Sequence, residues 1–432
     1  MTSTDDLLAR HRAVMPSWMP LYYAEPLEIV SGSGRRVTCS DGRTYLDFFG
    51  GVLTTMVGYD IPEITEAVER QLRTGVAHTS TLYLIRAQVE LAEKIARLSG
   101  IPDARVFFTN SGTEANEAAL LMATNYRRSN QILAVRNSYH GRSYAAMGIT
   151  GHRSWSSSSL NPLQVSWLHS SDRLRGLLSR LGADEHVDAA VDDLREVLAT
   201  QTAGDVAALI AEPVQGVGGF VAGPDGLFGA LKKVLDETGI LLISDEVQTG
   251  WGRTGDHFWG YQAHGVVPDL LTFAKGIGNG YALAGVVGRA DVVNEVPAIS
   301  FSTFGGNPIS TAAGNATLDY VLDHDLQANA ARTGAILRDG LREQVGDNPI
   351  VGEIRGRGLM LAIELVQPGT TVPDVPATLR VFEACRQGGL LVGKGGLYNN
   401  VLRMGPPLTL TEDEAREALD ILVNAIREAS AA

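Results

Sequence analysis

The sequence has few of the residues that cross-linked, nucleic-acid-binding or membrane-spanning proteins require. It has two cysteines, Cys39 and Cys385, in 432 residues, and neither a disulfide framework nor a cysteine metal site is indicated. Acidic residues exceed basic ones by 49 to 36, a formal net charge of −13, which argues against nucleic acid or an anionic membrane as a partner. No apolar run approaches the roughly 18 residues of a membrane-spanning helix. The acidic N-terminus is unlike a signal or transit peptide, so we expect a cytoplasmic protein with reduced thiols.

The residues that are present are typical of a large α/β enzyme. Hydrophobic residues make up 44% of the chain, and its 48 glycines indicate many turns. From about residue 105, short apolar runs alternate with helical patterns, which predicts the α/β class. Because 432 residues exceed one ordinary core, we expect a large domain and a smaller one.

Two of the apolar runs end in residues that can act together. Residues 240–244 lead to Asp245, and residues 270–274 lead to Lys275. The separation is long enough for a crossover between neighbouring strands, so a carboxylate and an amine can open into one crevice. Pyridoxal phosphate needs such a pair, an amine for its aldehyde and a carboxylate for its pyridine nitrogen. Taken alone, the two residues are explained more simply as a strand-end cap and a solvated lysine.

A second candidate site is the turn after the strand predicted at 105–108. Ser111, Gly112 and Thr113 lie in this turn, just before a helix predicted at 114–126 that is rich in Ala, Leu and Met. Free amide groups and the helix dipole at such a place attract phosphate. An ordinary Ser/Thr helix cap explains the same residues.

Two further strands are expected to end in polar residues. The strand at 131–135 is followed by Tyr139, which can stack on a planar cofactor, and by His140. The strand at 207–211 ends in Glu212 and a glycine-rich loop. By contrast, we expect the Ser-rich and then charged region from 154 to about 202 to be peripheral.

Taken together, these segments resemble the class III, fold-type I pyridoxal phosphate aminotransferases over nearly the whole chain. The resemblance rests on six motifs in the family's order: FFTNSGTEANEAAL, NSYHG, AEPVQG, ISDEVQTGWGRTG, FAKGIGNG and STFGGNP. The runs YLDFFGG and HTSTL and the long stretch from DEVQTG to GIGNG are most similar to the alanine–glyoxylate and β-amino acid aminotransferase branch. The family fold implies a large cofactor-binding domain at 60–325, with a mainly parallel seven-stranded sheet flanked by helices. It also implies a small α+β domain from 1–59 and 326–432, and a homodimer or dimer of dimers with active sites at the interface.

The resemblance assigns a role to each matching residue. Lys275 would form the Schiff base with the cofactor and carry protons during transfer, and Asp245 would pair with the pyridine nitrogen. The other implied cofactor-binding residues are Ser111, Gly112 and Thr113 at the phosphate, Tyr139 and His140 at the ring, Gln248 near its phenolic oxygen, Glu212, and Thr303, which the neighbouring subunit contributes to the phosphate. No metal is expected.

The substrate residues are implied in the same way. Arg403 resembles the family's carboxylate-binding arginine, whose planar fork suits an amino or keto acid, and Glu212 resembles the glutamate that can pair with it. A surface arginine on an edge strand is the alternative. Pocket volume would depend on residues such as Tyr22, Tyr23, Phe49, Tyr83 and Trp251. The sequence departs from the family at Gly58-Tyr-Asp-Ile-Pro62, where many relatives read Gly-His-x-His-Pro, and the loop 393–400 is expected to shape the pocket.

The implied activity is ping-pong transfer of an amino group from an amino acid, including ω- and β-amino acids, to pyruvate, glyoxylate or 2-oxoglutarate. A decarboxylase or an amine phospho-lyase on the same scaffold is the alternative, because the cofactor permits several bond cleavages. A catalytically silent relative with a structural role is a third hypothesis, which the presence of Lys275, Asp245 and the phosphate turn disfavours. The sequence does not select the donor.

Overall fold

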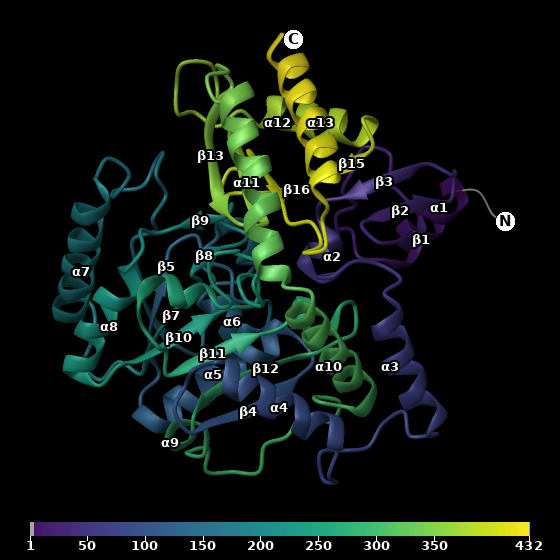
Figure 1. Ribbon diagram of the computed structural model, residues 1–432. Helices are drawn as coiled ribbons and strands as arrows, with labels where there is room; N and C mark the ends of the chain where they lie inside the picture. Colours follow the sequence, from purple (N-terminus) through teal and green to yellow (C-terminus); the bar gives the residue numbers. More distant parts are fainter. Residues whose placement is uncertain (1–3, 432) are drawn as a thin grey trace.

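The computed structural model describes residues 4–431, and its largest feature is the seven-stranded sheet in the lower half of Figure 1. The strands, in the order in which they lie side by side, are β4 (Ala104–Thr109), β12 (Ala284–Arg289), β11 (Leu270–Phe273), β10 (Leu241–Asp245), β7 (Ala208–Ala211), β5 (Gln131–Val135) and β6 (Gln164–Leu168). All neighbours pair in parallel except β12, which is antiparallel to both β11 and β4. The sheet is mainly parallel and flanked by helices, so the predicted fold class is confirmed.

Helices cover both faces of this sheet, which explains why its central strands are apolar at almost every position. Successive side chains of a strand point to opposite faces. In β7, Leu209 packs with α7 (Ala183–Thr200) and α8 (Leu227–Thr238), whereas Ile210 packs with α5 (Gly112–Arg127). The same alternation recurs in β5 and β10. The remaining helices of this part are α3 (Pro62–Arg73), α4 (Arg86–Leu98), α6 (Tyr144–Gly148), α9 (Ala290–Val293) and α10 (Pro308–Asp323).

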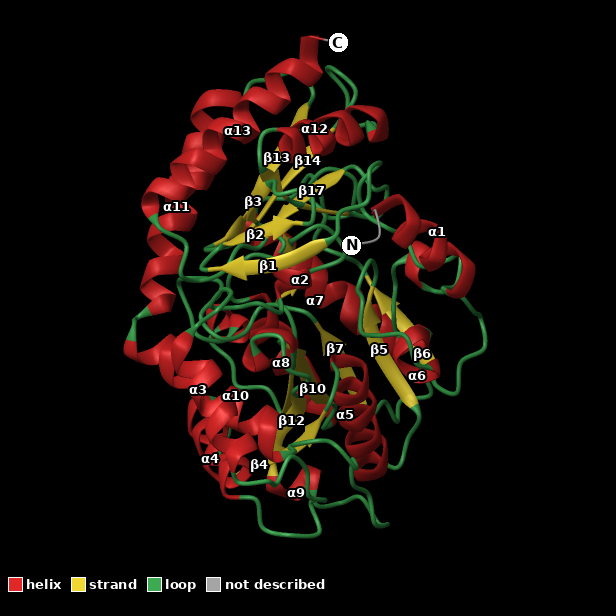
Figure 2. Cartoon of the chain, turned by 90° about the vertical axis from the view of Figure 1, so that its right-hand side faces the viewer, coloured by secondary structure: helices red, strands yellow, loops and turns green. Residues whose placement is uncertain are grey.

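Segments from both ends of the chain build the part above the large sheet (Figures 1 and 2). One four-stranded sheet has the order β1 (Ile29–Ser33), β2 (Arg36–Cys39), β3 (Thr44–Asp47) and β15 (Leu390–Leu391), and a second has the order β13 (Val351–Arg357), β14 (Met360–Leu365), β17 (Val401–Met404) and β16 (Gly393–Gly395). The helices here are α1 (Thr4–Val14), α2 (Gly50–Leu53), α11 (Leu326–Val345), α12 (Val375–Gln387) and α13 (Glu412–Ala431). The parallel pairing of Leu46 with Leu390 joins the two ends of the chain. The expected domain limits stay a prediction.

The region from 154 to 202, which was expected to be peripheral, contains the edge strand of the large sheet. Its segment Gln164–Leu168 forms β6, which pairs in parallel with β5 along its whole length. Val165 and Trp167 pack against the core on the α5 side of the sheet, although most of β6 is only half-buried. An edge strand has a single hydrogen-bonded neighbour and needs less apolar sequence than a central one, which is why its pattern was missed.

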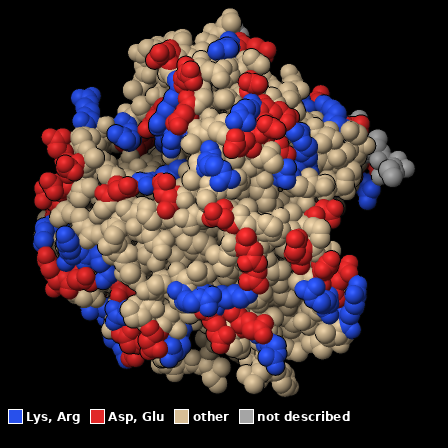
Figure 3. All heavy atoms as spheres, in the orientation of Figure 1, with Lys and Arg blue, Asp and Glu red and all other residues tan. Residues whose placement is uncertain are grey.

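The surface charges, the helices and the buried cysteines bear on the possible partners of the protein. Figure 3 shows acidic and basic side chains interspersed over the face seen in Figure 1. Between residues 4 and 431, no helix is both long and apolar enough to cross a membrane, and no three His, Cys, Asp or Glu side chains are placed to hold a metal ion. Both cysteines are buried and free.

Candidate active site

A cavity of about 370 Å³ lies at the carboxyl ends of the central strands. Strands β10 and β11 are parallel neighbours, as predicted, with Asp245 opposite Thr272. Asp245 therefore ends one strand beside the place where the chain reaches Lys275, and both line the cavity. The predicted residues that share this cavity with them are Ser111, Gly112, Thr113, Tyr139, Glu212 and Gln248. These residues come from five segments of the chain, which converge at the carboxyl ends of the strands, where ligands of open α/β sheets bind.

Asp245 is fixed by three neighbours. Its Oδ2 accepts a hydrogen bond from Asn116 Nδ2 at 2.8 Å and lies 2.8 Å from His140 Nδ1. Its Oδ1 accepts from the backbone amide of Val247 at 3.1 Å. The same Asn116 amide group donates to the carbonyl of His140 at 2.7 Å, so the carboxylate and the imidazole are held as one unit. Because these hydrogen bonds prevent the Asp245 carboxylate from rotating, it can face a cationic ring nitrogen in a fixed orientation.

Asn116 is a site residue that the sequence reading missed. It lies on α5 one turn after Gly112, inside the motif that begins with the phosphate turn, and its side chain is buried. Asn is an unfavourable residue for a helix interior because its side chain competes for backbone hydrogen bonds. An Asn within an Ala-rich helical pattern was therefore the available signal for a polar contact.

Lys275 has an amine whose protonation is shifted by its surroundings. Burial lowers its pKa from 10.5 to about 8, while the carboxylates of Asp245 and Glu212 act in the opposite direction and Arg403 adds to the lowering. A neutral amine is the form that attacks an aldehyde and accepts a proton. The backbone at Lys275 has a φ of +52°, a left-handed conformation that is uncommon and costly for a residue with a side chain.

The turn at the start of α5 serves as a cap and leaves amides open. Ser111 is the N-cap, and its Oγ accepts from Glu114 N at 3.3 Å, while the Glu114 carboxylate accepts from Asn110 N at 2.9 Å. The first amides of the helix have no partner inside the helix, so they can bind an anion. A Cβ on Gly112 would lie 3.0 Å from Val247 Cγ1, so a larger residue would press on the cavity wall. The predicted helix cap and the predicted phosphate site are thus compatible.

Glu212 and Arg403 meet at one residue, Gly216, without pairing with each other. Glu212 accepts from Tyr139 N at 2.9 Å and from Gly216 N at 2.8 Å, and burial raises its pKa to about 7. Arg403 donates to the carbonyl of Gly216 at 3.1 Å and to that of Lys394 at 3.1 Å. Its Nε is buried and has no hydrogen-bond partner among residues 4–431, a free donor suited to a carboxylate.

The surface location considered for Arg403 is wrong. Strand β17 lies between β14 and β16, and Arg403 is 3% exposed. Its guanidinium lies between the rings of Phe49 and Phe220, at 5.4 and 5.6 Å from their centroids. Tyr22 stacks on Phe49 with ring centroids 5.2 Å apart, so these two rings pack over the arginine. The 370 Å³ cavity is not lined by Arg403, Tyr22 or Phe49.

Other predicted residues lie farther from the cavity. Thr303 is on an exposed loop and does not line the cavity of its own chain. Trp251 is 2% exposed and packs with Trp259 and Phe273 in the core, so its expected part in setting pocket volume is not supported. Tyr83 is 70% exposed. Tyr23 stacks on Phe382 and hydrogen-bonds the carbonyl of Val392; like Tyr83, it does not line the cavity.

The donor set fits pyridoxal phosphate. Gln248 contributes a side-chain amide whose Oε1 is buried without a hydrogen-bond partner in the described part of the chain and whose Nε2 can donate to a phenolic oxygen. Tyr139 lines the same cavity and makes an edge-to-face contact with Trp155. The Asp245 carboxylate suits the pyridine nitrogen of the cofactor, and the Lys275 amine suits its aldehyde. Gln248 and Tyr139 suit the ring and its phenolic oxygen, and the N-terminus of α5 suits the phosphate. The fold and the site define a pyridoxal phosphate-dependent enzyme of fold type I.

The chain belongs to the class III aminotransferases, whose family model matches residues 22–426. It is 40% identical over 430 residues to the mitochondrial alanine–glyoxylate aminotransferase 2 homolog 2 of Arabidopsis thaliana, covering 98% of this chain and 87% of the relative. It is 39% identical over 411 residues to the acetylornithine aminotransferase of Mycolicibacterium smegmatis, covering 94% and 95%. The suspected branch is therefore supported, and the enzyme is a transaminase.

Solved structures agree with this assignment. A transaminase obtained by ancestral reconstruction superposes with a TM-score of 0.91 at 29% identity, with 99% of each chain covered. A phospholyase from Arthrobacter, solved with phosphoethanolamine, superposes with a TM-score of 0.89 at 34% identity, covering 98% of this chain and 99% of that one. The same scaffold therefore occurs with two reaction types.

Proposed function

We propose that this aminotransferase moves an amino group from an α-, β- or ω-amino acid to a small keto acid by a ping-pong mechanism centred on Lys275 and Asp245. The observation that carries the proposal is the convergence of these two residues, from neighbouring parallel strands, on a cavity that also receives the N-terminus of α5. Bound pyridoxal phosphate supplies the electron sink that stabilises negative charge on the substrate carbon.

Each residue of the chain has a stated task in this proposal. The Lys275 amine, with a pKa near 8, holds the cofactor and then moves a proton to and from the substrate carbon. Asp245, oriented by Asn116 and His140, keeps the ring nitrogen protonated. The amides at Ser111 to Thr113 bind the phosphate, and Gln248 and Tyr139 orient the ring.

The substrate carboxylate is assigned to Arg403. Its guanidinium has a buried unpaired donor and contacts backbone carbonyls rather than carboxylates, so an incoming carboxylate exchanges with neutral acceptors instead of breaking an ion pair. Glu212 accepts a hydrogen bond from the amide of the same Gly216. In this proposal it pairs with Arg403 when the bound substrate has no α-carboxylate.

A half-reaction screen tests the proposal directly. Purified enzyme loaded with cofactor is mixed with one amine donor at a time, without acceptor, and the absorbance of the cofactor is followed; alanine, β-alanine, β-aminoisobutyrate and 4-aminobutyrate are the first donors. Conversion to the amine form of the cofactor, reversed by pyruvate, glyoxylate or 2-oxoglutarate, is the expected result. A donor that is consumed without that conversion would contradict transamination.

A phospho-lyase activity is the second candidate, because one superposable structure is a phospholyase in complex with phosphoethanolamine. The screen therefore includes phosphoethanolamine, with released phosphate measured. Phosphate release without formation of the amine form of the cofactor would select this alternative.

The proposal includes a homodimer in which Thr303 of the neighbouring subunit reaches the phosphate. Its exposed position, outside the cavity of its own chain, supports this assignment. A cytoplasmic location stays a prediction; the three relatives named as alanine–glyoxylate aminotransferase 2 or its homologue are mitochondrial proteins.

A further inference from the structure

The turn from Gly216 to Gly219 is the piece of backbone that holds the two groups assigned to the substrate. It connects β8 (Val214–Gln215) to β9 (Val221–Ala222). Its first residue, Gly216, donates to Glu212 and accepts from Arg403. Its last residue precedes Phe220, whose ring lies 5.6 Å from the Arg403 guanidinium. Any shift of this turn therefore moves three contacts of the substrate site together.

Arg355, on β13, holds the far end of that turn. Its Nε donates to the carbonyl of Gly219 at 2.8 Å. Gly219 has a φ of +103°, and a Cβ there would lie 2.9 Å from Arg355 Nη2 and 3.3 Å from the Cα of Gly396. The turn is thus pressed against the arginine on one side and against the loop 393–400 on the other, and Gly396 N donates to Val217 O at 3.0 Å.

The guanidinium of Arg355 is itself fixed by carboxylates. Its Nη1 donates to Glu364 Oε2 at 2.6 Å and to Glu353 Oε2 at 2.8 Å. Glu364, on β14, is 2% exposed. A buried arginine that satisfies two carboxylates and one carbonyl is held rigidly, because losing any one contact leaves a desolvated charge or dipole.

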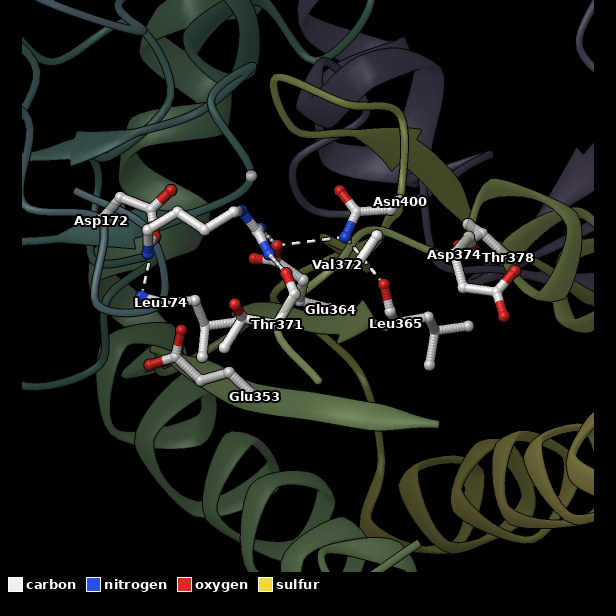
Figure 4. Close-up of polar contacts among 12 residues, drawn as sticks. Asp172, Leu174, Glu353, Glu364, Leu365, Thr371, Val372, Asp374, Thr378 and Asn400 are labelled. Atoms are coloured by element: carbon white, nitrogen blue, oxygen red, sulfur yellow. Dashed lines mark hydrogen bonds and ion pairs between the residues drawn. The ribbon is translucent and has the colours of Figure 1, made fainter. Parts of the chain in front are cut away.

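Glu364 joins this anchor to the strand that carries Arg403. Its Oε1 accepts from Asn400 Nδ2 at 3.1 Å, and Figure 4 shows the two side chains facing one another. Asn400 also donates to the carbonyl of Leu365 at 2.8 Å and immediately precedes β17. Arg175, from the loop after β6, forms a second ion pair with Glu364. The Glu364 carboxylate therefore contacts Arg355 on β13, Asn400 just before β17, and Arg175 in the loop after β6 of the large sheet.

We propose that Arg355, anchored by Glu364, is a positioning residue for substrate carboxylate recognition, since it sets the place of the Gly216–Gly219 turn against Arg403 and Glu212. The proposal rests on the proposed function in taking Arg403 as the carboxylate-binding group. A change at Arg355 should therefore weaken the binding of the substrate carboxylate. It should leave the cofactor contacts at Lys275 and Asp245 intact.

The test compares Arg355→Lys with a matched control, Arg289→Lys. The lysine at 355 keeps the buried positive charge but loses the Nε donor to the Gly219 carbonyl. Arg289 makes a comparable contact, 2.6 Å from Nη1 to Asp269 Oδ1, at the amino end of β11, away from the cavity. Three quantities are measured for each protein: binding of acetate, a bare carboxylate, from the cofactor absorbance; KM and kcat for L-alanine with glyoxylate; and the cofactor dissociation constant.

For Arg355→Lys, we expect acetate binding to weaken and KM to rise by about tenfold, the size of one lost hydrogen bond to a charged group. We expect kcat and the cofactor dissociation constant to change less than about twofold, because the hydrogen bonds of Arg355 go to Gly219, Glu353 and Glu364 and not to Lys275, Asp245 or the phosphate turn. Arg289→Lys is expected to leave all three quantities unchanged. Unchanged acetate binding in Arg355→Lys, or equal weakening in both variants, would overturn the proposal, as would a matching loss of cofactor affinity.

A third variant separates this proposal from the proposed function. Arg403→Ala should abolish measurable acetate binding. If acetate still binds to Arg403→Ala, or if it does not bind to the unaltered enzyme, the assignment of Arg403 as the carboxylate-binding residue fails. The inference about Arg355 then fails with it. If Arg403→Ala responds as expected and Arg355→Lys does not, only the positioning role of Arg355 is refuted.

Discussion

The reactivity of the Lys275 amine should depend on pH in a way that an ordinary lysine does not show. Burial lowers its pKa from 10.5 to about 8, a penalty on the charged form on the order of 3 kcal/mol. At pH 7.5 about a quarter of such amines are neutral, against about one in a thousand for an unperturbed lysine. The rate of covalent capture of the cofactor should therefore be on the order of 200-fold higher than for a solvated lysine with the same intrinsic nucleophilicity.

The assay uses protein freed of cofactor and mixed rapidly with pyridoxal phosphate between pH 6 and pH 10.5. Because the lowered pKa favours the neutral form above it, the capture rate should rise through pH 8 and level off above about pH 9. Glu212→Gln should move the midpoint to lower pH, since the Glu212 carboxylate raises the Lys275 pKa. Lys233→Gln, a change of an exposed lysine on α8, is the control and should leave the midpoint in place.

Two results would refute this reasoning. A rate that keeps rising toward pH 10.5 would show that burial does not lower the Lys275 pKa. A midpoint that moves to higher pH in Glu212→Gln would show that the sign of the electrostatic contribution from Glu212 is wrong.

The remaining predictions concern the neighbours of the cofactor. Asp245→Asn should lower kcat by at least about 100-fold while leaving the unfolding midpoint nearly unchanged, because the amide cannot keep the ring nitrogen protonated; steady-state kinetics and urea unfolding measure the two quantities. Asn116→Leu should cost about 1–3 kcal/mol of unfolding free energy, since it removes the amide that donates to both the Asp245 carboxylate and the buried His140 carbonyl. Thr303→Ala should weaken phosphate binding at the site of the other subunit. A mixed dimer of one Thr303→Ala chain and one Lys275→Ala chain should therefore keep one intact site, with Lys275 from the first chain and Thr303 from the second, and regain partial activity. Equal loss of activity in all mixed dimers would contradict that arrangement.

Much of the large sheet was predictable because its strands are local patterns. The strands predicted at 105–108 and 131–135 lie within β4 and β5. The pair of Asp245 and Lys275 was predictable because each follows an apolar run and the chain between them is long enough for a crossover.

The contacts that orient these groups were not predictable in the same way. Asn116 reaches Asp245 across 129 residues, and Arg355 reaches Gly219 across 136. Such pairs depend on how strands and turns pack, and a periodic pattern in one segment contains no information about its partner. The strand Gln164–Leu168 was missed for a related reason, because an edge strand needs little apolar sequence of its own.

The central claim is that Lys275 is the residue to which pyridoxal phosphate is covalently attached, beside Asp245. The most direct measurement is reduction of the cofactor-loaded enzyme with borohydride, proteolysis, and mass spectrometry of the modified peptide. We expect the cofactor on the peptide that contains Lys275, and we expect no modified peptide from Lys275→Ala. Modification of a different lysine, or undiminished modification in Lys275→Ala, would contradict it.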